Sequence, residues 1–197
     1  MIQGNNPISS RHGITTSTTG EPASLEKTYA AVNRMLEDGI IESYAIGGAM
    51  AVAFYMEPDS TFDVDIFCIV KGMSDQALNI LKPIYEYCGA KGYESRHEGI
   101  LIEGFEVQFL PVFDELSEEA VREAAVPTYG NTPVRVMQPE HLVAIMLKTG
   151  RPKDEARIVR FIDAGAFDPA KLDVILSRHG LDAKREVLGE LLRRLDI

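Results

Sequence analysis

The sequence predicts an α+β fold, in which a mixed sheet flanked by helices is followed by a C-terminal helical bundle. Up to about residue 137, short runs rich in β-branched and aromatic residues are interspersed with segments of helical periodicity. Beyond that point every periodic segment is helical. We therefore expect a boundary near residues 136–138, which divides the chain into a flexible arm over 1–23, a sheet-containing domain over 24–137 and a helical region over 138–197.

Local signals justify each expected element. Apolar residues at helical spacing before Gly39 predict a helix over 24–39, because glycine commonly ends a helix. Proline in the first turn predicts a helix from Lys82 to about Ala90. Gly104 separates two apolar runs, 99–103 and 105–112, which predicts a hairpin. The other expected strands are 43–46, 62–70 and 134–137, and the other expected helices are 49–56, 117–124, 139–149, 152–165, 169–179 and 181–195.

Composition narrows the range of possible functions. The formal net charge is −10, which argues against a broad DNA-binding surface, since such surfaces carry basic patches. No run approaches the ~20 apolar residues that cross a bilayer, so no membrane association is expected. The start of the chain has no charged-then-apolar signal pattern, and we expect a cytoplasmic protein. Two cysteines, Cys68 and Cys88, are too few for a disulfide framework, and a zinc site built on them is not expected.

Two carboxylates lie one residue apart within an apolar run, DVDIF. In a strand, Asp63 and Asp65 leave the same face. Close carboxylates repel unless a cation lies between them, and magnesium prefers oxygen ligands of this kind. The alternative is that both side chains are simply solvated at a sheet edge.

Two glycines, Gly47 and Gly48, follow a short apolar strand and precede a short apolar helix in the sequence YAIGGAM. Glycine lets backbone N–H groups approach a ligand closely, and a helix start favours phosphate. The alternative is a tight strand-to-helix turn that needs no ligand.

Taken together, the glycine pair, the short helix and the D-x-D strand resemble the nucleotidyltransferase superfamily that includes DNA polymerase β. A second segment, from Lys148 to Asp154, resembles the "K…R-x-K-D" segment of AbiEii-type nucleotidyltransferases, a group tied to phage defence and toxin–antitoxin pairs. The resemblance covers residues 25–165 and implies a nucleotidyltransferase-like mixed sheet.

The resemblance also implies roles for individual residues. Asp63 and Asp65 would bind two Mg²⁺ ions and carry catalysis, with Glu106 as a third ligand or base. An NTP would be the substrate. Its binding residues would be Gly47, Gly48, Thr61, Gln108, Lys148, Arg151, Lys153 and Asp154, with Asp154 orienting a basic group. The alternative for 148–154 is a solvated helix end with ordinary ion pairs.

The sequence departs from the family pattern in two places. The position of the family's third carboxylate belongs to Gln108, and a neutral amide is a poor base or magnesium ligand. Glu106 lies on the same face ~6–7 Å along the strand, and either reaches the site or is an exposed strand residue. No arginine occurs in the stretch 56–61 that leads into D-x-D, although Thr61 is kept.

Three functions follow from these observations. The first is a magnesium-dependent transferase that moves a nucleoside monophosphate from an NTP to an acceptor. The second is a catalytically degenerate nucleotide-binding or partner protein of the toxin–antitoxin type, and the third is a structural protein without a nucleotide. The sequence does not distinguish a small-molecule, protein or tRNA acceptor and does not give the oligomeric state. His141 lies in a predicted helix beside the proposed pocket, and we expect a structural role for it.

Overall fold

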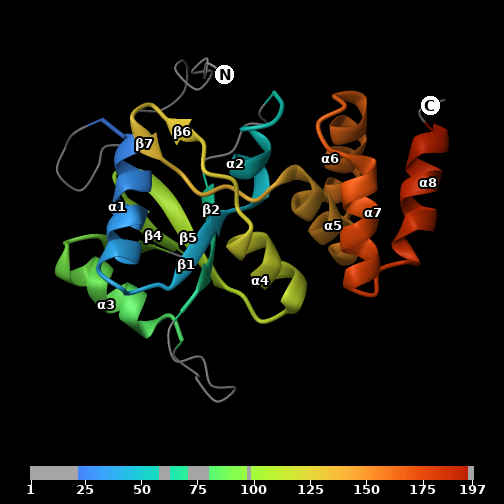
Figure 1. Ribbon diagram of the computed structural model, residues 1–197. Coiled ribbons are helices and arrows are strands. Elements are labelled where there is room, and N and C mark those ends of the chain that lie inside the picture. The colour runs from blue at the N-terminus through green and yellow to red at the C-terminus, as the bar shows by residue number, and fades with distance from the viewer. Residues whose placement is uncertain (1–21, 58–62, 71–79, 97–98, 195–197) are drawn as a thin grey trace.

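The computed structural model describes residues 22–57, 63–70, 80–96 and 99–194 (Figure 1). Its strands are β1 (Ser43–Ile46), β2 (Asp63–Ile69), β3 (Glu94–Arg96), β4 (Gly99–Ile102), β5 (Phe105–Pro111), β6 (Thr128–Tyr129) and β7 (Thr132–Pro133). Its helices are α1 (Leu25–Glu37), α2 (Gly48–Val52), α3 (Lys82–Ala90), α4 (Glu115–Arg122), α5 (Pro139–Thr149), α6 (Pro152–Asp163), α7 (Pro169–Arg178) and α8 (Lys184–Arg194). The expected α+β class is confirmed.

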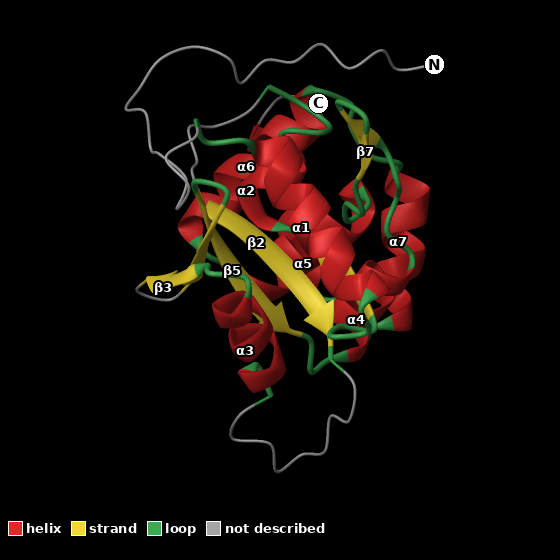
Figure 2. Ribbon diagram, turned by 90° about the vertical axis from the view of Figure 1, so that its left-hand side faces the viewer, coloured by secondary structure: helices red, strands yellow, loops and turns green. Residues whose placement is uncertain are grey.

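A five-stranded mixed sheet with the order β1-β2-β5-β4-β3 forms the centre of the fold. The strands β2 and β5 are parallel, and every other neighbouring pair is antiparallel. Figure 2 shows β2 and β5 side by side. The predicted hairpin at Gly104 is confirmed by the antiparallel pairing of β4 with β5.

Helices cover the sheet and bury its apolar residues. The hydroxyl of Thr28 in α1 donates a hydrogen bond to the carbonyl of Ile102 at 3.0 Å, which attaches α1 to β4. Helix α4 packs against β1 and β2, and α2 packs against β2. Apolar side chains from the helices and strands, such as Tyr29 and Ile66, are fully buried in one cluster.

The C-terminal helices α5–α8 gather beside the sheet (Figure 1). Helix α5 packs against α6 and α7 and also against α4 and α2, so the helical region is joined to the sheet through α4 and α2. The core cluster continues into it through residues such as Phe161 and Leu172. The expected boundary at 136–138 falls where the chain enters α5, and a division into domains there stays a prediction.

Several local predictions differ from the structure. No strand forms over 134–137; Val136 makes only isolated bridges, with Ile46 and Ala125. Val134 and Val136 are fully buried, so a run packed on the core produced the same apolar pattern as a strand. The helix expected over 49–56 ends at Val52. The short strands β3, β6 and β7 were not predicted, because they lack an apolar alternation.

Two further observations concern the cysteines and the helices of the described ranges. Cys68 and Cys88 are buried free thiols. None of the described helices has the length and apolar character needed to span a membrane.

Candidate active site

Four polar side chains form a block on one face of the two parallel strands. The register places Asp63 opposite Glu106 and Asp65 opposite Gln108. Residues paired across neighbouring strands point to the same side of a sheet, as do residues two apart in one strand. Asp63 is exposed, whereas the other three are half-buried. Glu106 therefore lies on the same face as the two aspartates, and Gln108 is the direct neighbour of Asp65. These four residues, three of them carboxylates, form the acidic block.

The glycine pair lies against this block. The N–H of Gly47 donates a hydrogen bond to the carbonyl of Asp65 at 2.9 Å. Gly48 has a positive φ of 55°, and a Cβ on it would lie 1.9 Å from the Asp65 carboxylate oxygen Oδ2. A Cβ on Gly47 would lie 2.4 Å from the ring of Phe67. Both positions therefore exclude larger residues, and Gly48 leaves the space that Asp65 occupies.

Opposing charges act on Asp65. Burial raises the pKa of its carboxyl group above the ordinary value, and the negative charge of Asp63 raises it further. The cations Lys153, Arg157 and Arg151 act in the opposite direction. All three lie at or near the start of α6, so the structure brings this end of the helix within electrostatic reach of the acidic block.

Asp154 organises the start of α6. Its side chain is 1% exposed and accepts hydrogen bonds from Arg151 Nε at 2.6 Å and from the Thr149 hydroxyl at 2.8 Å. Arg157 forms a longer ion pair with it, at 3.7 Å. A buried carboxylate with several donors fixes the groups around it. Asp154 thus holds two of the three cations that act on Asp65.

Lys148 contacts the start of α4 and is not among the cations that act on Asp65. Its ammonium donates a hydrogen bond to Asp114 Oδ1 at 2.8 Å, and Asp114 caps the start of α4 by accepting from the N–H of Ser117. Lys148 also lines a small cavity of about 170 Å³ together with His179 and Leu181. Within the described ranges, the structure pairs Lys148 with α4, whereas Arg151 and Lys153 act on Asp65. Thr61 lies outside the described residues.

One residue near the acidic block was missed. Arg157 follows Lys153 by four residues and Asp154 by three, which places all three on neighbouring positions of one helix face. That spacing was visible in the sequence, but it is equally typical of a solvated face.

No family model matches the chain, and no curated protein matches it in sequence. Among solved structures, it is similar to an antigenic nucleotidyltransferase-like protein from Paracoccidioides brasiliensis, with a TM-score of 0.50 and 17% identity over 90% of this chain and 94% of that chain. The fold is nucleotidyltransferase-like.

Two further structures match this nucleotidyltransferase-like fold more distantly. One is the solution structure of the antibiotic-resistance factor ANT(2'')-Ia, with a TM-score of 0.46 and 16% identity over 87% of this chain and 96% of that chain. The other is ANT(2'')-Ia in complex with adenylyl-2''-tobramycin, with a TM-score of 0.43 and 17% identity over 83% and 96%. The match with a TM-score of 0.50 confirms a nucleotidyltransferase-like fold, whereas membership of the superfamily and of its AbiEii-type group stays a prediction.

Proposed function

We propose that this chain is a magnesium-dependent nucleotidyltransferase that transfers a nucleoside monophosphate from an NTP to an acceptor. One observation carries the proposal. Asp63, Asp65 and Glu106 share one face of the sheet beside Gly48, and the cations of α6 act on the same acidic block. Carboxylates for a metal and cations for a triphosphate are the two parts that phosphoryl transfer requires.

The donor set fits magnesium. Oxygen ligands from carboxylates are what this ion prefers, and the raised pKa of Asp65 reflects burial and a neighbouring negative charge that a bound cation would offset. Asp63 and Asp65 would hold two Mg²⁺ ions, with Glu106 as the third carboxylate. Bound there, the ions would neutralise charge on the triphosphate.

The chain's own residues account for the rest of the proposed mechanism. Arg151, Lys153 and Arg157 bind the phosphate oxygens, and Asp154 keeps two of these cations in position. An acceptor hydroxyl oxygen forms a bond to the α-phosphorus, the bond to pyrophosphate breaks, and Glu106 takes the hydroxyl proton. The nearby backbone of Gly47 and Gly48 lets the nucleotide approach closely.

Calorimetry tests this proposal. We expect at least one of the four NTPs to bind to the wild type in the presence of Mg²⁺, and we expect this binding to be lost in the Asp63→Asn/Asp65→Asn variant. The matched control is Glu94→Gln, which removes an exposed carboxylate from β3 in the same sheet. Binding that survives in the double aspartate variant contradicts the proposed site. Absence of binding to folded wild type supports a structural protein instead.

A second candidate is a nucleotidyltransferase fold that binds nucleotide or a partner without turnover. The observation that favours it is the neutral Gln108 directly beside Asp65. A site with one carboxylate fewer holds metal ions less firmly, since ligand charge helps to set affinity.

Gln108→Asp separates the two candidates. If the missing carboxylate limits turnover, the variant gains transfer activity by about 10-fold or more, the scale of ~1.4 kcal/mol of transition-state stabilisation. The measurement is release of pyrophosphate from the NTP that calorimetry identifies, with Gln138→Asp as a control at a half-buried glutamine outside the sheet. An unchanged rate in a folded, nucleotide-binding variant contradicts this explanation.

The proposal also covers the subgroup to which the protein belongs, its cellular location and the acceptor. We extend it to the AbiEii-type group and to a toxin–antitoxin pair because of the Arg151–Asp154 segment. We also propose a cytoplasmic location. The acceptor is left open among a small molecule, a protein and tRNA.

A further inference from the structure

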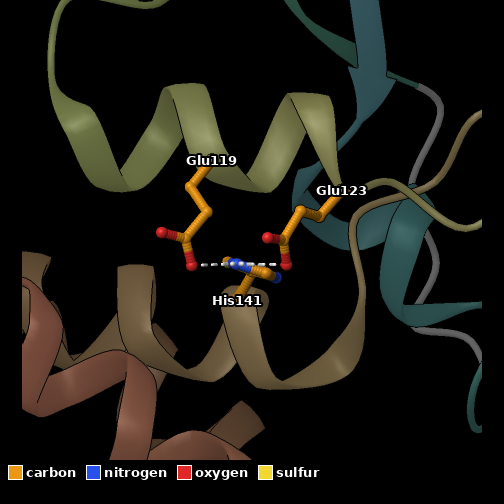
Figure 3. A group of neighbouring side chains, drawn as sticks. All are labelled: Glu119, Glu123 and His141. Carbon is orange, nitrogen blue, oxygen red and sulfur yellow. Dashed lines mark hydrogen bonds and ion pairs between the residues drawn. The ribbon is translucent and has the colours of Figure 1, made fainter.

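A second group of possible metal ligands lies where α4 meets α5. Glu119 and Glu123 are four residues apart on α4, so they leave the same helix face. His141 belongs to the first turn of α5, and its ring lies between the two carboxylates (Figure 3). Its Nε2 atom is 3.2 Å from Glu119 Oε1 and 4.0 Å from Glu123 Oε2. The three ligand atoms lie within 4.8 Å of one another.

The histidine is buried in an unusual way. Its side chain is 2% exposed, and within the described ranges its Nδ1 atom has no hydrogen-bond partner. Buried polar atoms nearly always have a hydrogen-bond partner. Here hydrogen bonding accounts for one ring nitrogen, Nε2, and leaves the other without a partner. The nitrogen that does have neighbours faces two carboxylates.

We propose that Glu119, Glu123 and His141 bind a divalent transition metal ion of the zinc type. In a tetrahedral zinc site, bond lengths of 2.0–2.2 Å separate ligand atoms by about 3.4 Å. The pair formed by Glu119 and His141 already has nearly this spacing. Only Glu123 must move closer, and its side chain is 53% exposed and thus free to do so.

The donor set distinguishes this site from the acidic block on the sheet. Imidazole nitrogen suits zinc and its neighbours in the first transition row, whereas sites made only of carboxylates suit magnesium. With three protein ligands, the fourth position would belong to water, on the exposed side near Glu123. The inference goes beyond the proposed function and does not depend on it.

The surroundings of Glu119 are compatible with metal binding. Its Oε1 also accepts from Arg178 Nη1 at 2.8 Å, and its Oε2 lies 3.0 Å from His179 Nε2. Arg178 is half exposed, so giving up its contact costs little.

A metal ion at this position would cross-link two parts of the fold. Helix α4 packs on β1 and β2, and α5 leads directly to the start of α6, where Asp154 arranges its cations. Because an ion that binds only the folded state stabilises it, zinc is expected to raise the melting temperature.

Cobalt serves as the spectroscopic probe, because Co²⁺ replaces zinc and absorbs visible light in a tetrahedral site. Untagged full-length protein is titrated with Co²⁺, followed by Zn²⁺ as a competitor. We expect one Co²⁺ per chain with tetrahedral absorption that zinc removes. In Glu123→Gln the affinity falls at least 10-fold, and since this side chain is exposed, folding is preserved. His141→Gln, checked for folding by circular dichroism, removes the absorption.

Two controls locate the ion. Glu115→Gln removes an exposed carboxylate from the same helix, and the Asp63→Asn/Asp65→Asn variant removes two of the three carboxylates of the acidic block on the sheet. Both are expected to bind Co²⁺ as the wild type does. The proposal is overturned if the wild type gives no tetrahedral absorption, if Glu123→Gln binds as tightly as the wild type, or if the aspartate variant loses the ion.

Discussion

Replacing Asp65 with asparagine is expected to reduce nucleotide transfer at least about 10²-fold while raising thermal stability in metal-free buffer at neutral pH. Burial, and then the charge of Asp63, raises the pKa of the Asp65 carboxyl group, so its ionised form is less favourable in the folded protein than in the unfolded chain. Asparagine has nearly the same shape and no charge. The proposed function thus explains why an unfavourable carboxylate stands at this position.

The pH dependence of this effect has a definite sign. In the unfolded chain Asp65 loses its proton near the ordinary pKa of about 3.9, whereas the folded protein holds the proton to higher pH. Over that interval the unfolded state binds fewer protons, so stability falls as pH rises. The loss is complete above the folded pKa and absent below the unfolded one. The stability gain of Asp65→Asn is therefore largest near neutral pH and disappears in acid.

Thermal unfolding of the wild type and Asp65→Asn between pH 3 and pH 7, with a chelator present, measures this difference. Glu94→Gln is the control, because its exposed carboxylate on β3 is expected to leave the melting temperature nearly unchanged. Adding Mg²⁺ should raise the melting temperature of the wild type and leave Asp65→Asn unchanged. A variant that is less stable than the wild type at pH 7 without metal would show that Asp65 supports the fold rather than a ligand.

The acidic block was largely predictable from sequence because its geometry is local. A strand has a period of two, so Asp63 and Asp65 had to share a face once DVDIF formed a strand. The resemblance then indicated that Glu106 and Gln108 lie on a neighbouring strand, and the register of β2 with β5 agrees. The roles of these residues stay predictions.

The positions of the basic residues in the segment 148–154 were less predictable from the sequence, because the end of α5 and the start of α6 divide this segment. Gly150 adopts a positive φ of 63° and ends α5, so the chain changes direction between Lys148 and Lys153. One short motif is thereby split between two helices, and Lys148 pairs with Asp114 instead. Direction after a turn depends on packing between helices, which the motif itself does not encode.

Contacts between segments far apart in the sequence were the hardest to predict from the sequence. Glu119 and His141 are 22 residues apart and lie on different helices, with no motif linking them. The error at 134–137 has the same origin, since an apolar run is recognisable locally but its hydrogen-bond partners are not. Sequence patterns thus predicted the elements, and tertiary packing decided which of their side chains meet.

Gly48→Ala is expected to destabilise the protein and to displace Asp65. Two costs combine at this position. A φ of 55° is unfavourable for alanine by about 1–2 kcal/mol, and the new Cβ would lie 1.9 Å from Asp65 Oδ2, which adds about 1–3 kcal/mol as overpacking. Because the Asp65 carboxylate must move, Mg²⁺-dependent nucleotide binding is expected to be lost as well.

Gly165→Ala separates the two costs. Gly165 has nearly the same φ, 56°, but a Cβ there meets nothing within 4 Å, so this variant reports the backbone cost alone. Denaturant unfolding should show a larger loss for Gly48→Ala than for Gly165→Ala. In an Asp65→Ala background, where the carboxylate is absent, Gly48→Ala should cost only as much as Gly165→Ala, because the coupling between the two positions is the clash itself. Equal losses of stability for the two glycine variants in the wild-type background would mean that the Asp65 carboxylate does not need the space left by Gly48. The glycine pair would then be a strand-to-helix turn unconnected to the acidic block.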